Sequence, residues 1–188
     1  MISEFVSFVE ELFPSITPYT KEQVRQAIRQ FEQSGQQYKY CMHEPVSYLA
    51  QGDIVDALPF IKYDEKGNQS LLKTKGILLS NTCDAENDDV VVFAPLLPID
   101  KIKLERSVVT SNLIYRFLYI PDSNLLDYVV DMSLINSFSK NLIETGIVQN
   151  KLNKVASLNQ FGYYLFLCKL TVHLMRPEDR EVQTVRAG

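Results

Sequence analysis

The chain has 188 residues, of which 46% are hydrophobic, and a net charge of −4 at pH 7. This length is typical of one globular domain, and the composition excludes a disordered chain. Nucleic-acid binders usually carry surplus positive charge, so the acidic total argues against broad, nonspecific nucleic-acid binding and leaves room for a local basic patch. Three widely spaced cysteines form neither a disulfide framework nor a zinc motif, which indicates reduced thiols.

The first 35 residues predict a pair of helices. Apolar residues recur at helical spacing over 3–13, and Thr20 with Gln23 forms a capping-box pattern before a second apolar stripe. We interpret segment 1–35 as a helical hairpin that covers one end of the following domain. The alternative interpretation is a docking helix for a partner protein.

The same segment indicates where the protein resides. Glu4, Glu10 and Glu11 lie where a signal peptide would have positive charge and an uninterrupted apolar stretch. The longest apolar runs are far shorter than the roughly 20 residues that a membrane helix needs. We therefore expect a cytoplasmic protein that makes no membrane contact.

From residue 48 the pattern changes to short runs rich in β-forming residues. The predicted strands span 53–62, 71–82, 90–94, 114–120 and 128–132, with turn-forming stretches at 64–68 and 84–89. Short strands without long helices between them favour an antiparallel barrel or a strongly bent sheet. We expect a short helix inserted at 102–112.

The carboxyl end returns to helical periodicity. Apolar residues over 157–175, among them Leu165, Cys168 and Val172, predict a helix that packs against the sheet, and Ser157 begins a second capping-box pattern. Cys168 is therefore expected to be an inert core thiol. The chain thus divides into 1–35, a barrel with its helix at 48–176, and a polar tail at 177–188.

Six short segments follow one another in an order that is known from one toxin family. They are Gly-Asp-Ile-Val at 52–55, Gly-Ile-Leu-Leu-Ser at 76–80, Val-Val-Val-Phe-Ala-Pro at 90–95, Asp-Met-Ser-Leu-Ile at 131–135, Ser-Lys-Asn-Leu at 139–142, and the helix at 157–175. This series resembles the PemK/MazF toxins, which are SH3-like barrels that cut RNA. Over roughly 49–175 the resemblance implies an α+β fold with an SH3-like antiparallel barrel, in a bacterial toxin–antitoxin or phage-defence module.

The chain departs from that family at the catalytic positions. The family has a catalytic Arg before the second strand and a catalytic Thr after the third, whereas this chain has Lys-Thr-Lys at 73–75 and Leu-Leu-Pro at 96–98. Lysine presents a point charge where arginine presents a fork, so the exchange is not neutral. Two functions therefore stay open: an RNA-directed endoribonuclease with a rebuilt site, or a non-catalytic protein-interaction module on the same barrel.

The residues that would rebuild the site lie on either side of the second predicted strand. Lys73 or Lys75 would stabilise charge, and Thr82, Cys83 or Asp84 would handle protons. In a straight strand Lys75 and Thr82 would be roughly 20 Å apart, so only a strong bend or a second subunit would join them. The alternative for the polar cluster at 80–84 is local capping, because Asn, Thr and Asp readily bond neighbouring amides.

Other chemistry has weaker support. His43 with Cys83 would form a Cys–His dyad, but no spacing supports it, and Cys41 with His43 lacks the usual zinc spacing. The chain has no glycine-rich phosphate loop. We expect no cofactor and no metal, and we expect a protein partner or a homo-oligomer, with RNA as a further candidate; the roles of Cys41 and His43 stay open.

Overall fold

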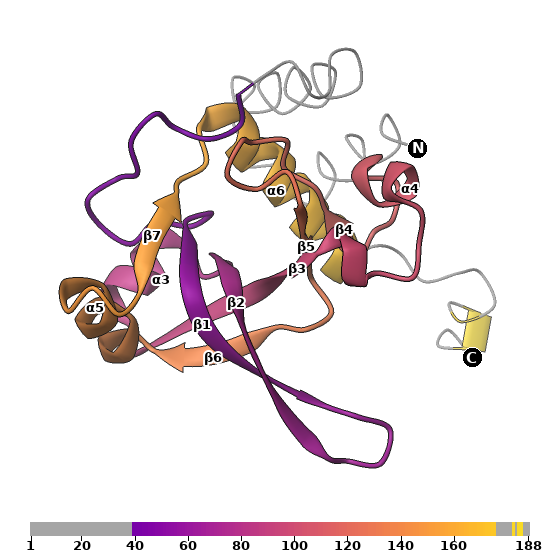
Figure 1. Ribbon diagram of the computed structural model, residues 1–188, viewed down its shortest axis with the longest axis horizontal. Helices are drawn as coiled ribbons and strands as arrows, with labels where there is room; N and C mark the ends of the chain where they lie inside the picture. The colour runs from indigo at the N-terminus through magenta and orange to yellow at the C-terminus, as the bar shows by residue number, and fades with distance from the viewer. Residues whose placement is uncertain (1–38, 176–181, 183, 186–188) are drawn as a thin grey trace.

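Within residues 39–175, seven antiparallel strands form one bent sheet, in the order β4-β5-β3-β2-β1-β7, with β6 paired to β3 (Figure 1). The computed structural model describes residues 39–175, 182, 184 and 185. The predicted helical pair at 1–35 lies outside the described residues, as does most of the predicted tail at 177–188. The division of the chain into these units stays a prediction.

The strands and helices follow in this order: β1 (Ile54–Tyr63), β2 (Gln69–Leu78), α3 (Thr82–Asn87), β3 (Val90–Pro98), η2 (Ile99–Lys101), α4 (Arg106–Thr110), β4 (Phe117–Leu118), β5 (Tyr128–Asp131), β6 (Asn136–Ser139), α5 (Lys140–Val148), β7 (Asn153–Ala156) and α6 (Gln160–Met175). The predicted inserted helix at 102–112 corresponds to α4. None of the described helices has both the length and the apolar composition that a membrane crossing requires.

The bend of the sheet arises at β3. Phe93 pairs with Leu78 of β2 and with Asn136 of β6, whereas Leu96, three residues later, pairs with Val130 of β5. β6 and β1 are joined by a side chain and not by strand pairing. The side-chain amide of Asn136 accepts a hydrogen bond from Ile61 N (2.7 Å) and donates one to Ile61 O (3.2 Å). The predicted antiparallel α+β class is confirmed, while closure into an SH3-like barrel stays a prediction.

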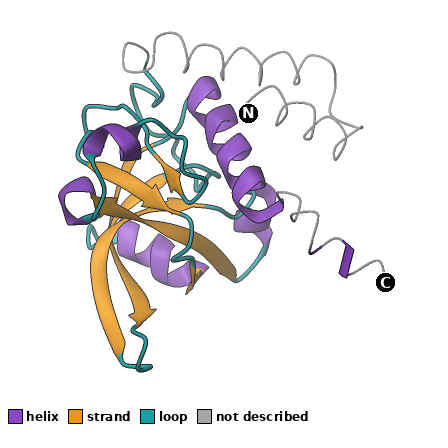
Figure 2. Cartoon of the chain, turned by 90° about the vertical axis from the view of Figure 1, so that its right-hand side faces the viewer, coloured by secondary structure: helices purple, strands orange, loops and turns teal. Residues whose placement is uncertain are grey.

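Two hydrophobic cores lie on opposite faces of the sheet, to which neighbouring strand residues contribute alternately. One core lies between the sheet and α6, which runs alongside the strands (Figure 2), and contains Ile54, Ile77 and Phe166. The other contains Val55 and Leu78, together with Phe93, Phe138 and Ile143. In this second core the Phe138 ring meets Phe60 and Phe93 edge-on, at centroid distances of 5.3 and 5.8 Å.

The buried face of α6 differs from the predicted stripe. Leu165 is buried as predicted, but Phe161 and Val172 are only half-buried, and the centre of the face is Phe166, which has no exposed surface. The helix is apolar almost all round, so periodicity alone could not define which side faces the sheet. The predicted capping box was also wrong: Asn159 caps α6, and its side chain accepts from Gly162 N at 3.0 Å.

The sequence patterns did not predict two of the strands, and they assigned the wrong structure to two other segments. β6 and β7 contain Asn, Ser and Lys, which have low strand propensity, so pairing with β3 and β1 decides their structure. The predicted turn at 84–89 lies largely in α3. The predicted strand at 114–120 is reduced to two residues, Phe117–Leu118, and residues 114–116 and 119–120 on either side lie in turns or loops.

Candidate functional site

The predicted polar cluster at 80–84 lies at the start of the short helix α3. The side chain of Asn81 accepts a hydrogen bond from Cys83 N at 3.0 Å and caps the helix. The side chains of Cys83 and Asp84 are exposed in the first turn. Asn81 therefore has the local capping role that was considered for the polar cluster. A chemical role for Cys83 and Asp84 stays a prediction.

Thr82 connects α3 to two distant parts of the chain. Its Oγ1 accepts from Gln51 N at 3.0 Å, and the side chain of Gln51 donates to Leu79 O at 2.7 Å. Tyr163 of α6 donates its hydroxyl to Gln51 Oε1 at 2.9 Å, and burial raises the pKa of Tyr163. Tyr163 is therefore a neutral donor at neutral pH, and this group of side chains fixes the loop before β1.

Lys75 has a different neighbour. Its Nζ lies 4.2 Å from the ring centroid of Tyr128 on β5, which is a cation–π distance. The ring contact of Lys75 and the hydrogen bond of Thr82 involve different parts of the chain. The four predicted residues thus lie in two separate surroundings: Lys75 is on β2 and faces Tyr128 of β5, whereas Thr82, Cys83 and Asp84 are in α3.

Cys41 and His43 lie in different surroundings. Cys41 is buried beside Leu158, and burial together with nearby Asp122 raises the pKa of its thiol, whereas His43 is exposed. His43 and Cys83 are both exposed, and their pairing as a Cys–His dyad stays a prediction. In those same residues no cluster of three or more His, Cys, Asp and Glu has an arrangement that would hold a metal ion.

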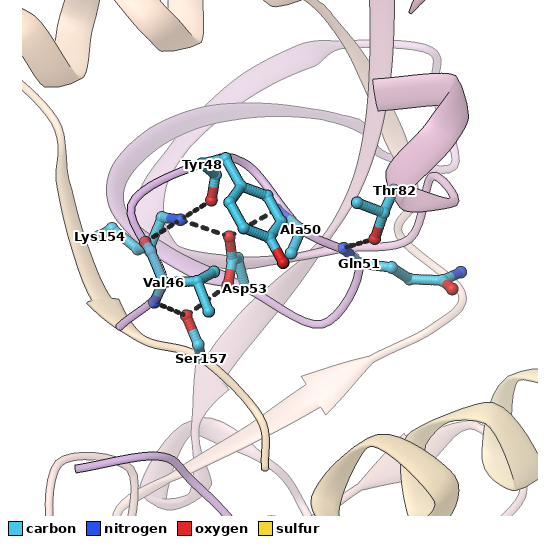
Figure 3. A network of polar contacts seen from close by, with 8 residues as sticks. All are labelled: Val46, Tyr48, Ala50, Gln51, Asp53, Thr82, Lys154 and Ser157. Carbon is cyan, nitrogen blue, oxygen red and sulfur yellow. Dashed lines mark hydrogen bonds and ion pairs between the residues drawn. The ribbon is translucent and has the colours of Figure 1, made fainter. Parts of the chain in front are cut away.

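Sequence reasoning missed a buried ionic network at the entrance to β1 (Figure 3). Asp53 is 1% exposed, and its carboxylate is 2.6 Å from Lys154 Nζ and accepts from Ser157 Oγ at 2.5 Å. It also accepts from Ala50 N at 2.7 Å. Asp53 and Ser157 are 104 positions apart, so no local spacing would have predicted their contact.

The network fastens the loop that precedes β1. Lys154 Nζ donates to the carbonyl groups of Val46 (2.8 Å) and Tyr48 as well as to Asp53, and Val46 N donates to Ser157 Oγ at 3.1 Å. Three partners use the three protons of the ammonium group. Because every charge is matched and bonded, the arrangement is suited to holding the loop in place rather than to proton transfer.

A second ionic group lies at the end of β5. Arg116 holds the fully buried Asp131 with two bonds, from Nε at 2.7 Å and from an Nη at 2.5 Å, and Ser133 donates to the same carboxylate from Oγ at 2.8 Å. Burial alone would raise the pKa of Asp131, but the bonds from Arg116 and Ser133 outweigh it and hold the pKa below its ordinary value. Asp131 therefore stays ionised, which makes it a poor general acid.

The sequence and the structure were compared with known proteins, and solved structures with a similar fold were found. No family model matches the sequence, and no curated protein matches it. A chain in the crystal structure of MazE-MazF (Form-II) from Deinococcus radiodurans aligns with 70% of this chain and 100% of its own length, at 11% identity and a TM-score of 0.41.

Proposed function

We propose that this chain is a protein-interaction module that binds its partner through the projecting β1–β2 hairpin. The proposal includes a cytoplasmic location, which the acidic residues near the amino terminus favour. It also includes a bacterial toxin–antitoxin or phage-defence setting, which the sequence resemblance to PemK/MazF toxins favours. The observation that carries the proposal is a row of exposed apolar side chains on this hairpin.

The row consists of Ile61, Tyr63 and Leu71, which are 40%, 67% and 67% exposed, and we call it the ribbon face. Ile61 pairs with Leu71, and Tyr63 pairs with Gln69, so these side chains lie on one side of the two-stranded ribbon. The hairpin extends away from the rest of the sheet (Figure 1). Adjacent exposed apolar side chains on a projecting element are typical of an interaction surface.

The tip of the hairpin is well ordered by its own hydrogen bonds. Asp64 accepts from Lys66 N and Asn68 N, each at 2.8 Å, and the side chain of Asn68 donates to it at 2.8 Å. Hydrogen bonds from Asn68 lower the pKa of Asp64, so the carboxylate persists at neutral pH. Gly67 takes a φ of +78°, which glycine adopts without strain. A preformed ribbon loses little conformational freedom when it binds.

The test uses the purified protein encoded next to this one. We expect isothermal titration calorimetry to detect binding by the wild type and a large loss of affinity in the triple variant Ile61→Ser, Tyr63→Ser, Leu71→Ser. The matched control is Leu113→Ser, because Leu113 is 60% exposed and lies outside the hairpin. Light scattering on the same samples tests whether the chain forms a homo-oligomer. If the wild type self-associates through the ribbon face, the triple variant should be monomeric.

The same preparation tests the ribonuclease alternative. Wild type and a Lys75→Ala, Asp84→Ala double variant are incubated with mixed RNA. Cleavage that disappears in the double variant would establish an active site and contradict a non-catalytic module. The proposal would be overturned if the wild type bound neither the neighbouring protein nor a second copy of itself. It would also be overturned if the triple variant bound as tightly as the wild type.

A further inference from the structure

The edge of β1 is open beyond its short pairing with β7. β7 pairs only with Ile54–Asp56, and after this point α5 lies beside the strand. A groove of about 320 Å³, which we call the edge groove, separates the two elements. Its walls are mainly apolar and include Leu58, Leu142 and Leu152.

This edge is unsuited to pairing with another strand. A bulge interrupts β1 between Val55 and Leu58, Ala57 has a φ of +66°, and Pro59 has no N–H to donate. Farther along, the side chain of Asn136 already bonds Ile61 N and O. An occupant of the groove must therefore bind through its side chains and not by extending the sheet.

Two lysines border the edge groove. Lys73 lies on β2 opposite Pro59, and Lys151 follows α5. Neither lysine has an ion-pair partner in the part of the chain that the structure describes. Two unpaired positive charges beside an apolar groove contrast with the net charge of −4 of the whole chain.

One rim of the edge groove borders the ribbon face. Side chains of one strand alternate between faces, so Pro59 and Lys73 lie on the same side of the ribbon as the Ile61–Leu71 pair. Leu58 and the α5 side chains of the groove lie on the opposite side, with the second core, so the groove opens at the edge of β1. A partner on the ribbon face reaches the groove by passing this edge.

We propose that the edge groove binds an acidic, apolar segment of a partner protein, an inference that rests on the proposed interaction function. Leucine-like side chains would enter the groove, and flanking carboxylates would pair with Lys73 and Lys151. RNA fits less well, because the walls are largely carbon and offer two cations but few hydrogen-bond donors for bases. The volume is at the lower end of the range for ligand pockets, about 300–1,000 Å³, and suits a few side chains.

Fluorescence anisotropy with three labelled peptides tests the chemistry. In the first peptide leucine alternates with glutamate, and in the other two every glutamate is replaced by lysine or by serine. We expect the full chain to bind the glutamate peptide at least roughly tenfold more tightly than either of the others, with an affinity that falls as salt is added. A labelled single-stranded RNA is the fourth probe.

Charge-reversal variants locate the binding. Lys73→Glu with Lys151→Glu should reduce affinity for the glutamate peptide by roughly tenfold or more, while Lys66→Glu with Lys103→Glu, which makes the same charge change at exposed positions elsewhere, should leave it nearly unchanged. Methyl signals of Leu142 in the wild type should shift on addition of the peptide.

Several results would overturn the inference. These are equal binding of the three peptides, full binding by the groove variant, or RNA that displaces the peptide and shifts the same methyl signals. The two proposals fail separately. If the neighbouring protein binds through the ribbon face while the groove variant binds it normally, the interaction function stands and the edge groove is not part of it.

Discussion

Removing the charge of Asp53 tests whether the buried network determines stability. Asp53→Asn keeps the shape of the side chain but leaves the ammonium of Lys154 without its counter-charge, in a site where the lysine side chain is only 10% exposed. Breaking a buried ion pair from one side costs about 3–5 kcal/mol, because an unpaired charge stays buried. Since Lys154 retains two carbonyl partners, we expect a loss of about 3 kcal/mol.

A double-mutant cycle isolates the interaction. Lys154→Met alone leaves the Asp53 carboxylate buried with Ser157 and Ala50 as donors, and we expect a similar loss of about 3 kcal/mol. The double variant should lose less than the sum of the two by about 1–3 kcal/mol, because neither charge then lacks its partner. Urea denaturation, followed by circular dichroism, measures each free energy of unfolding.

An exposed ion pair serves as the control. Arg106 and Asp127 are joined at 3.2 Å, with side chains 54% and 81% exposed, so Asp127→Asn should change stability by less than about 1 kcal/mol. Additivity of the Asp53 and Lys154 substitutions within about 0.3 kcal/mol would refute the reasoning. So would a loss below about 1 kcal/mol in each single variant.

Three further predictions concern the helix α6 and the thiols. Leu165→Ala should cost about 2–5 kcal/mol in urea melts through the cavity it leaves, and half-buried Val172→Ala should cost clearly less; equal losses would mean that the helix face is misassigned. Exposed Cys83 should react with a thiol reagent much faster than buried Cys168, whose pKa burial raises to about 12, and equal rates would contradict this placement. Burial lowers the pKa of Lys169 to about 8 from 10.5, so the unfolded chain binds more protons between these values and stability should rise with pH across that window; a Lys169→Met variant that keeps the whole rise would exclude this residue as its source.

The sequence predicts the strands best where β-forming residues are concentrated in one local run. β1, β2, β3 and β5 begin within about two residues of their predicted positions, because each contains a cluster of apolar residues next to turn formers. β6 and β7 carry no such pattern and form only where a partner strand is present. Long-range pairing, which no local window contains, decides them.

The site residues show the same division. The capping role of Asn81 follows from its residue type, because asparagine readily bonds neighbouring amides. The hydrogen bond between Thr82 and Gln51, in contrast, requires two segments that meet only in the folded chain. Ser157 had the residue type of a cap, yet its hydroxyl is bonded to Asp53, and Asn159 takes its place. Local chemistry names the candidates, and the tertiary contacts choose among them.

The ion pair of Asp53 with Lys154 and its hydrogen bond with Ser157 have a consequence for synthesis on the ribosome. The β1–β2 hairpin and its pairing with β3 use residues that emerge early, whereas Lys154 emerges about a hundred residues after Asp53. Until then the carboxylate of Asp53 lacks its counter-charge, and burying it would carry the desolvation cost of a lone ion. We therefore expect the loop at 46–53 to stay hydrated during elongation and to reach its final position late, after β7 has left the exit tunnel.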